Sequence, residues 1–436
     1  MHSCSYHQPV RIAWFSPLPP VRSGIASVNA ALLAQLDAEL AIDRFVDAPA
    51  VASARVFNAH DFVWKARRTP YDLVVYQLGN ASWHDYMWAY LAAYPGLVVL
   101  HDPRLHHARA RQLLQGGRAD DYRREFWYDH PHAVRDVVEY AVAGLSGPIY
   151  YTWPMLRAVV RTARAVCVHN ARVADDLRGE FPDARIETIR LGTPAVTPSA
   201  DARTRLRSAL GVADRATVFA MFGTITAEKR VAPVLEAFDA LRREGLDAHL
   251  LMVGDAAGCP GLADRLRTSD ARAHVTGYVD EARIGDYLSA ADACLCLRWP
   301  TALETSASWL QCLSASRATV ISDLAHLVDI PPPVALRVDL LDEAVSLRES
   351  MRMLATDEGA RARLAAAGYA YWAANHTVGA MADDYRRVIP LAAGLPPPQV
   401  TDLPAHFVED YSARAREIAD AFDVSVDVLG ERSRSG

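Results

Sequence analysis

Residues 218–231 read VFAMFGTITAEKRV. An apolar run of strand length ends at Gly223, and the basic pair Lys229 and Arg230 stands where a segment of helical spacing begins. An apolar strand, a glycine turn and a following helix are the repeating unit of a parallel sheet covered by helices. The stretch therefore predicts the first strand and first helix of an α/β domain.

The same unit recurs along the chain, because short runs rich in Val, Ile and Leu alternate with longer segments of helical period. These runs predict strands at residues 11–15, 73–77, 97–100, 165–169 and 186–191, and again at 218–222, 249–253, 273–276, 293–297 and 319–322. Between the two series, residues 191–204 are rich in Pro, Ser and Thr and have no apolar period, which indicates an interdomain linker. The sequence therefore predicts an α/β fold with two Rossmann-like, doubly wound domains.

We place the domain boundaries so that residues 1–192 form the first domain and residues 193–375 the second. Helical sequence continues to about residue 391, and a proline cluster at 396–398 precedes a last stretch that ends in ERSRSG. Residues 376–436 are expected to hold C-terminal helices that pack back toward the first domain, plus a flexible tail.

Composition and charge exclude several classes of protein. The 436 residues include 46 basic and 52 acidic ones, and the basic residues are dispersed, so no nucleic-acid partner is expected. The N-terminal stretch lacks the features of a secretory signal, and no apolar run approaches the roughly 20 residues that span a bilayer. We therefore expect a cytoplasmic protein. The six cysteines have neither metal-ligand nor disulfide spacing, which favours buried, reduced thiols.

Two candidate ligand sites follow strands of the first half. Ser23 and Gly24 open a helix, where free backbone N–H groups and a small residue suit a diphosphate. His101 and Asp102 directly follow a buried strand, at the edge where open parallel sheets bind ligands. Each pair also has a structural interpretation, because Ser23 and Asp102 can cap the following helix. Both interpretations stay open at this point.

Two further candidates follow strands of the second half. Lys229 and Arg230 place adjacent cations beside a helix start, which suits a diphosphate leaving group whose charge grows as its bond breaks. Glu304, Thr305 and Ser306 form a polar loop before another helix, where a carboxylate and hydroxyls can hold sugar hydroxyls and phosphate oxygens. A solvated basic pair and a helix cap are the structural alternatives.

Taken together and in this order, these segments resemble the retaining glycosyltransferases of the GT-B fold, specifically glycosyltransferase family 4 with its glycosyl transferases group 1 domain. The resemblance runs from about residue 11 to about residue 391. It is carried by WFSPLPPVRSGIA, by LVVYQLGN with PGLVVLHD, by FGTITAEKR, by LMVGD with VTGYVDEARIGDYLSAADACL, and by LRWPTALETS with ATVISD. It implies two Rossmann-like domains that face each other across a cleft, the first on the acceptor side and the second binding the nucleotide sugar.

The resemblance also implies roles for individual residues. It implies that the catalytic residues are Glu304, Lys229, Arg230 and His101. It implies that the donor diphosphate and sugar are bound by Ser23, Gly24, Gly223, Thr224, Thr305 and Ser306. It implies that the nucleoside lies at Gly254, Tyr278, Val279 and Cys312.

The chain departs from the family pattern at two of these positions. The family's leaving-group cations are an arginine five residues before a lysine, and Thr224 stands at the arginine position. Lys229 is therefore expected to carry the larger share, with Arg230 as a substitute and Arg298 as the next candidate. The second of the family's two glutamates, which contacts the ribose, is replaced by Cys312.

The function that the resemblance implies is transfer of a sugar, with retention of configuration, from a UDP-, GDP- or dTDP-sugar to an acceptor hydroxyl. The acceptor is expected to be a sugar, a lipid-linked glycan or a small molecule. No cofactor is expected, and the sequence has no Asp-x-Asp triplet at a strand end, so no metal is expected either. The alternatives are a GT-B epimerase or phosphorylase and a degenerate, non-catalytic nucleotide-binding protein.

An aromatic cluster in the first half is open to two interpretations. It consists of Trp83, Tyr86, Trp88 and Tyr90. Aromatic rings at helical spacing are typical of core packing, and they also suit stacking on a sugar or a lipid. A peripheral contact with a membrane is compatible with the second interpretation.

Overall fold

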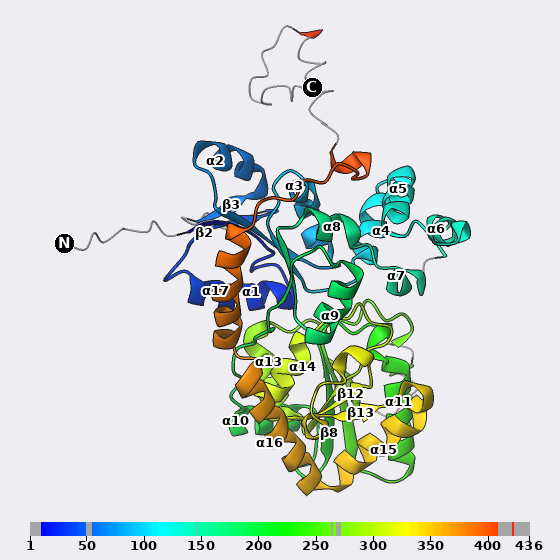
Figure 1. Cartoon of the computed structure of the whole chain (residues 1–436). Helices are drawn as coiled ribbons and strands as arrows, with labels where there is room; N and C mark the ends of the chain where they lie inside the picture. The colour runs from blue at the N-terminus through cyan, green and yellow to red at the C-terminus, as the bar shows by residue number, and fades with distance from the viewer. Residues whose placement is uncertain are drawn as a thin grey trace, which may run out of the picture.

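The computed structural model describes residues 10–48, 55–145, 147–262, 265–266, 272–408 and 421–422. In this part of the chain the strands form two parallel sheets, which occupy the upper and lower halves of Figure 1. The first sheet consists, in spatial order, of β3 (Val56–Asn58), β2 (Ala41–Val46), β1 (Arg11–Phe15), β4 (Leu73–Leu78), β5 (Leu97–Leu100), β6 (Ala165–Val168) and β7 (Ile186–Thr188). The second consists of β10 (Ala273–Val275), β9 (Ala248–Val253), β8 (Thr217–Phe222), β11 (Ala293–Cys296), β12 (Ala318–Ser322) and β13 (Leu336–Val338).

The predicted α/β fold with two doubly wound domains is confirmed. Every predicted strand is present, with ends that differ by a few residues at most. Three strands, β2, β3 and β13, were not predicted. The run of β2 is interrupted by Asp43 and Arg44, and β3 and β13 are only three residues long, so none of them has an apolar run of recognisable length.

Helices connect successive strands in both domains. In the first they are α1 (Gly24–Leu36), α2 (Phe62–Arg68), α3 (Trp88–Leu91), α4 (His106–Leu114), α5 (Ala119–Asp129), α6 (Arg135–Val142), α7 (Ile149–Thr152), α8 (Arg157–Thr162) and α9 (Ala171–Glu180). Those that follow are α10 (Ala200–Ala209), α11 (Val231–Arg243), α13 (Glu281–Ala290), α14 (Ala307–Ser314), α15 (Glu343–Thr356), α16 (Glu358–Asn375) and α17 (Val378–Gly394). Part of the expected linker is thus helical, because Ser199 caps α10 by accepting from the backbone N–H of Ala202 at 3.2 Å.

The chain crosses between the sheets twice, and the two crossings lie against each other. The Thr193 N–H donates to the carbonyl of His376 at 2.9 Å, and His376 Nδ1 lies 2.8 Å from the carbonyl oxygen of Leu191. A Cβ on Gly192 would lie 2.3 Å from the carbonyl oxygen of Thr377, so only glycine fits between the crossing segments. The second crossing delivers α17 to the first sheet.

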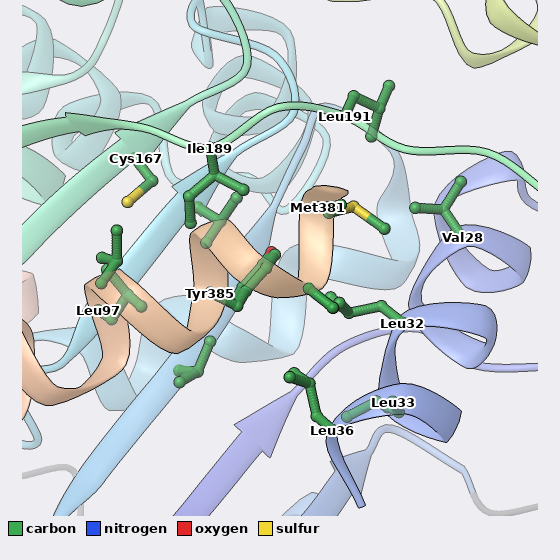
Figure 2. Packing of buried hydrophobic residues seen from close by; sticks show 14 of the residues in the cluster. Val28, Leu32, Leu33, Leu36, Leu97, Cys167, Ile189, Leu191, Met381 and Tyr385 are labelled. Carbon is green, nitrogen blue, oxygen red and sulfur yellow. The ribbon is translucent and has the colours of Figure 1, made fainter. Parts of the chain in front are cut away.

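Helix α17 packs beside α1 on the first sheet, where both bury apolar side chains in one core (Figure 2). The ring centroids of Tyr385 and Trp14 lie 5.4 Å apart, and the Tyr385 hydroxyl accepts from Gln77 Nε2 at 3.0 Å. The C-terminal helix therefore helps to fix a buried side chain of β4. The tail ERSRSG lies outside the described residues.

Of the helices between β5 and β6 in the chain, α8 packs on the first sheet, and α4 to α7 form a projection on the right of the first domain in Figure 1. They share a small core that includes Leu113, Tyr122 and Phe126. Among the described residues, no helix combines the length and apolar character needed to cross a membrane.

Candidate active site

Two cavities lie between the domains, at the carboxyl ends of the strands. The larger has a volume of about 400 Å³ and the smaller about 250 Å³. Residues of both domains line each of them, and five residues line both: Ser23, Gly24, Val28, Ala307 and Ser308. In each sheet the strand order reverses next to the first strand of the domain, which is where open parallel sheets bind their ligands. The cavities therefore form one divided cleft.

The division between the cavities is made by two helix N-termini. Ser23 caps α1 by accepting from the backbone N–H of Ile25 at 3.2 Å, and Ser306 caps α14 by accepting from that of Trp309 at 3.2 Å. Nothing lies within 4 Å of a Cβ built on Gly24, so the space in front of α1 is open. The N–H groups at such helix starts have no partner within the helix and favour an anion. Ser23 and Ser306 thus each cap a helix and also line a cavity.

The ends of β8 and β9 approach so closely that two glycines are required. Gly223 has a φ of 81° and Gly254 a φ of 152°, and a Cβ on Gly254 would lie 2.2 Å from the carbonyl oxygen of Gly223. Both residues line the larger cavity together with Thr224. The three predicted donor and nucleoside contacts on this wall are therefore brought together.

Lys229 and Arg230 point to different places although they are neighbours in the chain. Lys229 Nζ donates to the carbonyl of Phe222, and a Cβ on Gly223 would lie 3.0 Å from Nζ, so the ammonium lies beside the cleft. Burial, reinforced by the charge of Arg298, lowers the pKa of Lys229 to about 7. Arg230 instead makes a two-contact ion pair with Glu343, with Nε donating to Oε1 at 2.7 Å.

This geometry argues against Arg230 as the substitute for the missing arginine. Its guanidinium lines neither cavity of the cleft, nor the adjoining pocket that Lys229 shares with Arg298 and Glu304. Its backbone is left-handed, with a φ of 60°, at the start of α11. Arg298, by contrast, lines the smaller cavity. Its charge is close enough to Lys229 to depress the pKa of that lysine. Of the cations considered for the leaving group, Lys229 and Arg298 therefore lie together beside the Glu304 loop.

Glu304 is held by its own loop. Its Oε2 accepts from Thr301 Oγ1 at 2.8 Å and from the backbone N–H of Ala302 at 2.9 Å. Its Oε1 lies 2.8 Å from Arg298 Nε. Leu303 has a φ of 64°, a conformation that glycine adopts more readily, and it packs against the core of the first domain. The loop that presents Glu304, Thr305 and Ser306 is thus fixed from both domains.

His101 lies within a buried chain of polar side chains, between Gln77 and His169. Its Nε2 is 2.8 Å from Gln77 Oε1, its Nδ1 is 3.1 Å from His169 Nε2, and His169 Nδ1 is 2.9 Å from the carbonyl oxygen of Ile189. Burial lowers the pKa of His101 well below its ordinary value. His101 also lines the smaller cavity, so it presents a neutral imidazole there.

Asp102 does not cap a helix, because α4 begins only at His106 with Leu105 at its N-cap. Its Oδ2 instead accepts from the backbone N–H of Asn80 at 2.6 Å, which ties together the loops after β4 and β5. Asp102 lines the smaller cavity beside Glu304. Burial, together with the charge of Glu304, raises the pKa of Asp102 to about 6.

The far end of the larger cavity carries an exposed aromatic ring. Tyr278 is 45% exposed, and the guanidinium of Arg22 lies 4.2 Å from its ring centroid. Val279 lines the same cavity. Cys312 does not, because it is fully buried in the core of the second domain, with its Sγ 4.0 Å from Cys296 Sγ. The expected nucleoside contact at Cys312 is therefore wrong. Adjacent helix positions face different directions, so Gln311 lines the cavity while Cys312 faces the core.

Several lining residues were missed in the sequence. Asp255 follows β9, and Glu281 opens α13. Ser308 and Gln311 lie one turn apart on α14. A strand-end rule applied to β9 would have found Asp255, whereas the helix residues carry no signal of their own. In the aromatic cluster, Trp83 lines the larger cavity, while the other three rings pack in the first domain's core. Among the described residues, no group of three or more side chains could hold a metal ion.

Comparison with known proteins identifies a family domain in the second half of the chain. Residues 216–343 match the family model described as glycosyl transferases group 1. No curated protein matches the chain. Sucrose-phosphate synthase from Thermosynechococcus elongatus is similar in structure, with a TM-score of 0.61 at 15% identity over 88% of this chain and 99% of that one.

Two further solved structures are similar over most of their length. HepE from Anabaena, in complex with UDP-glucose, has a TM-score of 0.59 at 14% identity and covers 87% of this chain and 99% of its own. WaaG, a glycosyltransferase involved in lipopolysaccharide biosynthesis, has a TM-score of 0.57 at 13% identity and covers 88% and 100%. At these identities the likeness shows the shared fold, and the family model adds the class of enzyme. The chain is a glycosyltransferase of GT-B fold that carries a group 1 glycosyl transferase domain in its second half.

Proposed function

We propose that the enzyme transfers a sugar from a nucleoside-diphosphate sugar to an acceptor hydroxyl, with retention of anomeric configuration and without a metal. The observation that carries the proposal is the junction of the two cavities. Two helix N-termini meet there. Lys229 and Ser308 lie close to each other beside Gly223, because a Cβ on Gly223 would lie 3.0 Å from Lys229 Nζ and 3.2 Å from Ser308 Oγ. A diphosphate at this junction puts the nucleoside in the larger cavity and the sugar in the smaller one.

In this arrangement, different lining residues contact the diphosphate and the sugar. The N-termini of α1 and α14, with Lys229 and Arg298, stabilise the charge that develops on the departing diphosphate. His101 and Glu304 face the sugar in the smaller cavity. Thr305 and Ser306 line that cavity too and offer hydroxyl and backbone groups to the donor. The domain boundaries after residues 192 and 375 belong to the same proposal, with the acceptor on the first-domain side.

Retention is proposed from the resemblance to the retaining enzymes. The route is inferred from Glu304, a second-domain carboxylate that lines the smaller cavity and is already engaged. Both oxygens of Glu304 accept hydrogen bonds or an ion pair from its own loop, which disfavours attack on the anomeric carbon. We infer that the acceptor oxygen attacks from the face that the diphosphate leaves. The bond between the anomeric carbon and the diphosphate oxygen breaks, the glycosidic bond forms, and the hydroxyl proton passes to the departing diphosphate oxygen.

The test begins with the donor. A thermal-shift panel of UDP-, GDP-, ADP- and dTDP-sugars identifies the nucleotide, starting with UDP-glucose because HepE, of similar fold, is complexed with it. The donor that binds is then incubated with candidate sugar, lipid-linked and small-molecule acceptors, and NMR assigns the anomeric configuration of the product. A new glycoside of inverted configuration contradicts retention.

Other products decide between the remaining functions. Isomerised donor alone supports an epimerase, and phosphorolysed sugar supports a phosphorylase. Binding of nucleotide without transfer or slow donor hydrolysis supports a non-catalytic protein. The proposed function stands only if a glycoside with retained configuration forms.

A further inference from the structure

Glu281 and Gln311 face the larger cavity from two different helices. Gln311 Nε2 donates a hydrogen bond to Glu281 Oε1, which joins α14 to the first turn of α13 across the cavity wall. The remaining carboxylate oxygen of Glu281 and the amide oxygen of Gln311 are acceptors. Two acceptors side by side on the wall of a cavity suit a pair of neighbouring hydroxyl groups.

The position of this pair along α14 matches a nucleotide lying beside the helix. Ser308 lies at the diphosphate junction, where both cavities meet. Gln311 lies three residues further, and one helical turn advances about 5.4 Å, on the scale of the step from a phosphate to the ribose of its nucleotide. Beyond Gln311 the cavity reaches Tyr278, whose ring suits a base. The Glu281–Gln311 pair therefore lies between the diphosphate and base positions.

We propose that the Glu281–Gln311 pair binds the ribose hydroxyls of the donor and so selects ribonucleoside diphosphates over their 2′-deoxy counterparts. This rests on the proposed function and takes over the contact expected at Cys312, which is buried on the other side of α14. The carboxylate reaches the cavity from α13, one turn of α14 away from the diphosphate. A dTDP-sugar, which lacks the 2′-hydroxyl, is then a poor donor.

The test is calorimetric and needs no acceptor. UDP, GDP and ADP are each titrated against the full-length protein together with the matching 2′-deoxynucleoside diphosphate. For the base that binds, the ribonucleotide is expected to bind about tenfold or more tightly than its deoxy partner, since one hydrogen bond to a carboxylate is worth that much. Equal binding of both nucleotides overturns the proposal. Failure of all nucleotides to bind contradicts the proposed function instead.

Variants separate ribose recognition from a simple tie between helices. Glu281→Ala is expected to abolish the preference for the ribonucleotide and to lower the affinity for the deoxynucleotide, which keeps its 3′-hydroxyl, by a smaller factor. A loss of affinity for both nucleotides by the same factor means that Glu281 only braces α13 against α14, and an unchanged preference means that it contacts nothing; either result overturns the proposal. Gln311→Ala leaves the carboxylate in place and should reduce the preference less.

The matched control is Asp286→Asn on the same helix. Asp286 pairs with Arg205 at 3.2 Å and lines neither cavity of the cleft, so the change removes a carboxylate from α13 without altering the cavity. Its ribose preference should equal that of the wild type. Thermal unfolding without nucleotide checks that each variant is folded. A control that loses the preference as Glu281→Ala does would show that the charge of α13, and not the Glu281–Gln311 pair, is being measured, which overturns the proposal.

Discussion

The two walls of the cleft differ in how they carry charge. The second-domain wall presents Lys229, Arg298 and Glu304, each held by hydrogen bonds or an ion pair from its own loop or strand end. The first-domain wall presents His101, which lies in a buried, neutral chain between the amide of Gln77 and the imidazole of His169, with Asp102 beside it. One wall is therefore built to meet charge and the other to accept hydrogen bonds at low charge.

This difference assigns the chemistry to one side. A departing diphosphate gains negative charge, and preorganised cations stabilise it without rearrangement. A sugar is neutral, and a desolvated, neutral imidazole can pack against it without adding charge. Changes on the second-domain wall should therefore slow the chemical step, and the predictions below test that expectation.

The largest effect is expected from Lys229→Ala. If this cation meets charge that appears only as the diphosphate leaves, kcat should fall on the order of 10²–10³-fold while donor affinity changes less. Arg230→Ala is the matched control, because its neighbouring guanidinium pairs with Glu343 outside the two cavities. Steady-state kinetics and calorimetry with the donor give the two quantities. A wild-type kcat in Lys229→Ala moves the role to Arg298.

The next effect is expected from Glu304→Ala. Turnover should fall by at least ~10²-fold in a folded protein, because the contact that positions a reacting sugar is lost together with the order of the loop. Thr301→Val separates these causes, since it removes one hydrogen bond to the carboxylate and keeps the carboxylate itself. Circular dichroism and a turnover assay decide the matter. Near-normal turnover in Glu304→Ala reduces the residue to a brace for its loop.

The strand ends of this cleft were predictable and the helix surfaces were not. Ser23, His101 and Lys229 follow apolar runs, so the end-of-strand rule located them from the sequence. Glu281 and Gln311 lie on helices whose apolar period shows only that they are not core. Cys312 was misplaced because a family position was carried over without the helix phase, which turns position 312 into the core and leaves position 311 at the cavity.

Arg230 shows a second limit of the sequence. Two adjacent cations look equivalent in a linear chain, but here Arg230 is itself left-handed at the start of α11, and its side chain pairs with Glu343. The ion pair of Arg230 joins it to Glu343, 113 residues further along the chain, so no local sequence pattern predicts it. The fold itself was more predictable, because it depends on apolar period over long stretches. The three missed strands are the ones whose period is interrupted or too short.

A smaller effect is expected from pH. The pKa of Lys229 is lowered to about 7 by burial and by Arg298, against the opposing effect of Glu304, Cys296 and Cys312. Its ammonium is therefore present below pH 7 and is lost as the pH rises through that value, so kcat/KM for the donor should fall at alkaline pH. Lys229→Arg keeps its charge and should move this limb to higher pH. An unmoved limb assigns the titration to another group.

No effect at all is expected from removing divalent metal ions. Two carboxylates line the larger cavity, but Asp255 Oδ1 accepts from the backbone N–H of Ala257 at 2.9 Å, and Glu281 is hydrogen-bonded to Gln311. Magnesium and manganese prefer several oxygen ligands around one point, and here the groups nearest the diphosphate junction are N–H donors, hydroxyls and an ammonium. A dication there would be repelled by Lys229 and Arg298, so we expect the protein's own cations to take the place of a metal.

The measurement is turnover in the presence of a chelator, followed by titration with magnesium and with manganese. Turnover should stay at the untreated value throughout. The Lys229→Ala variant sharpens the test, because a vacated cation position is where a metal would act if the site could hold one. Since Glu304 is paired with Arg298 and Asp102 accepts from the backbone N–H of Asn80, added metal should leave the slow variant slow. Activity that vanishes in chelator and returns with either ion would mean that the second-domain wall is completed by a metal, and the contrast between the two walls would then rest on a bound ion rather than on Lys229 and Arg298.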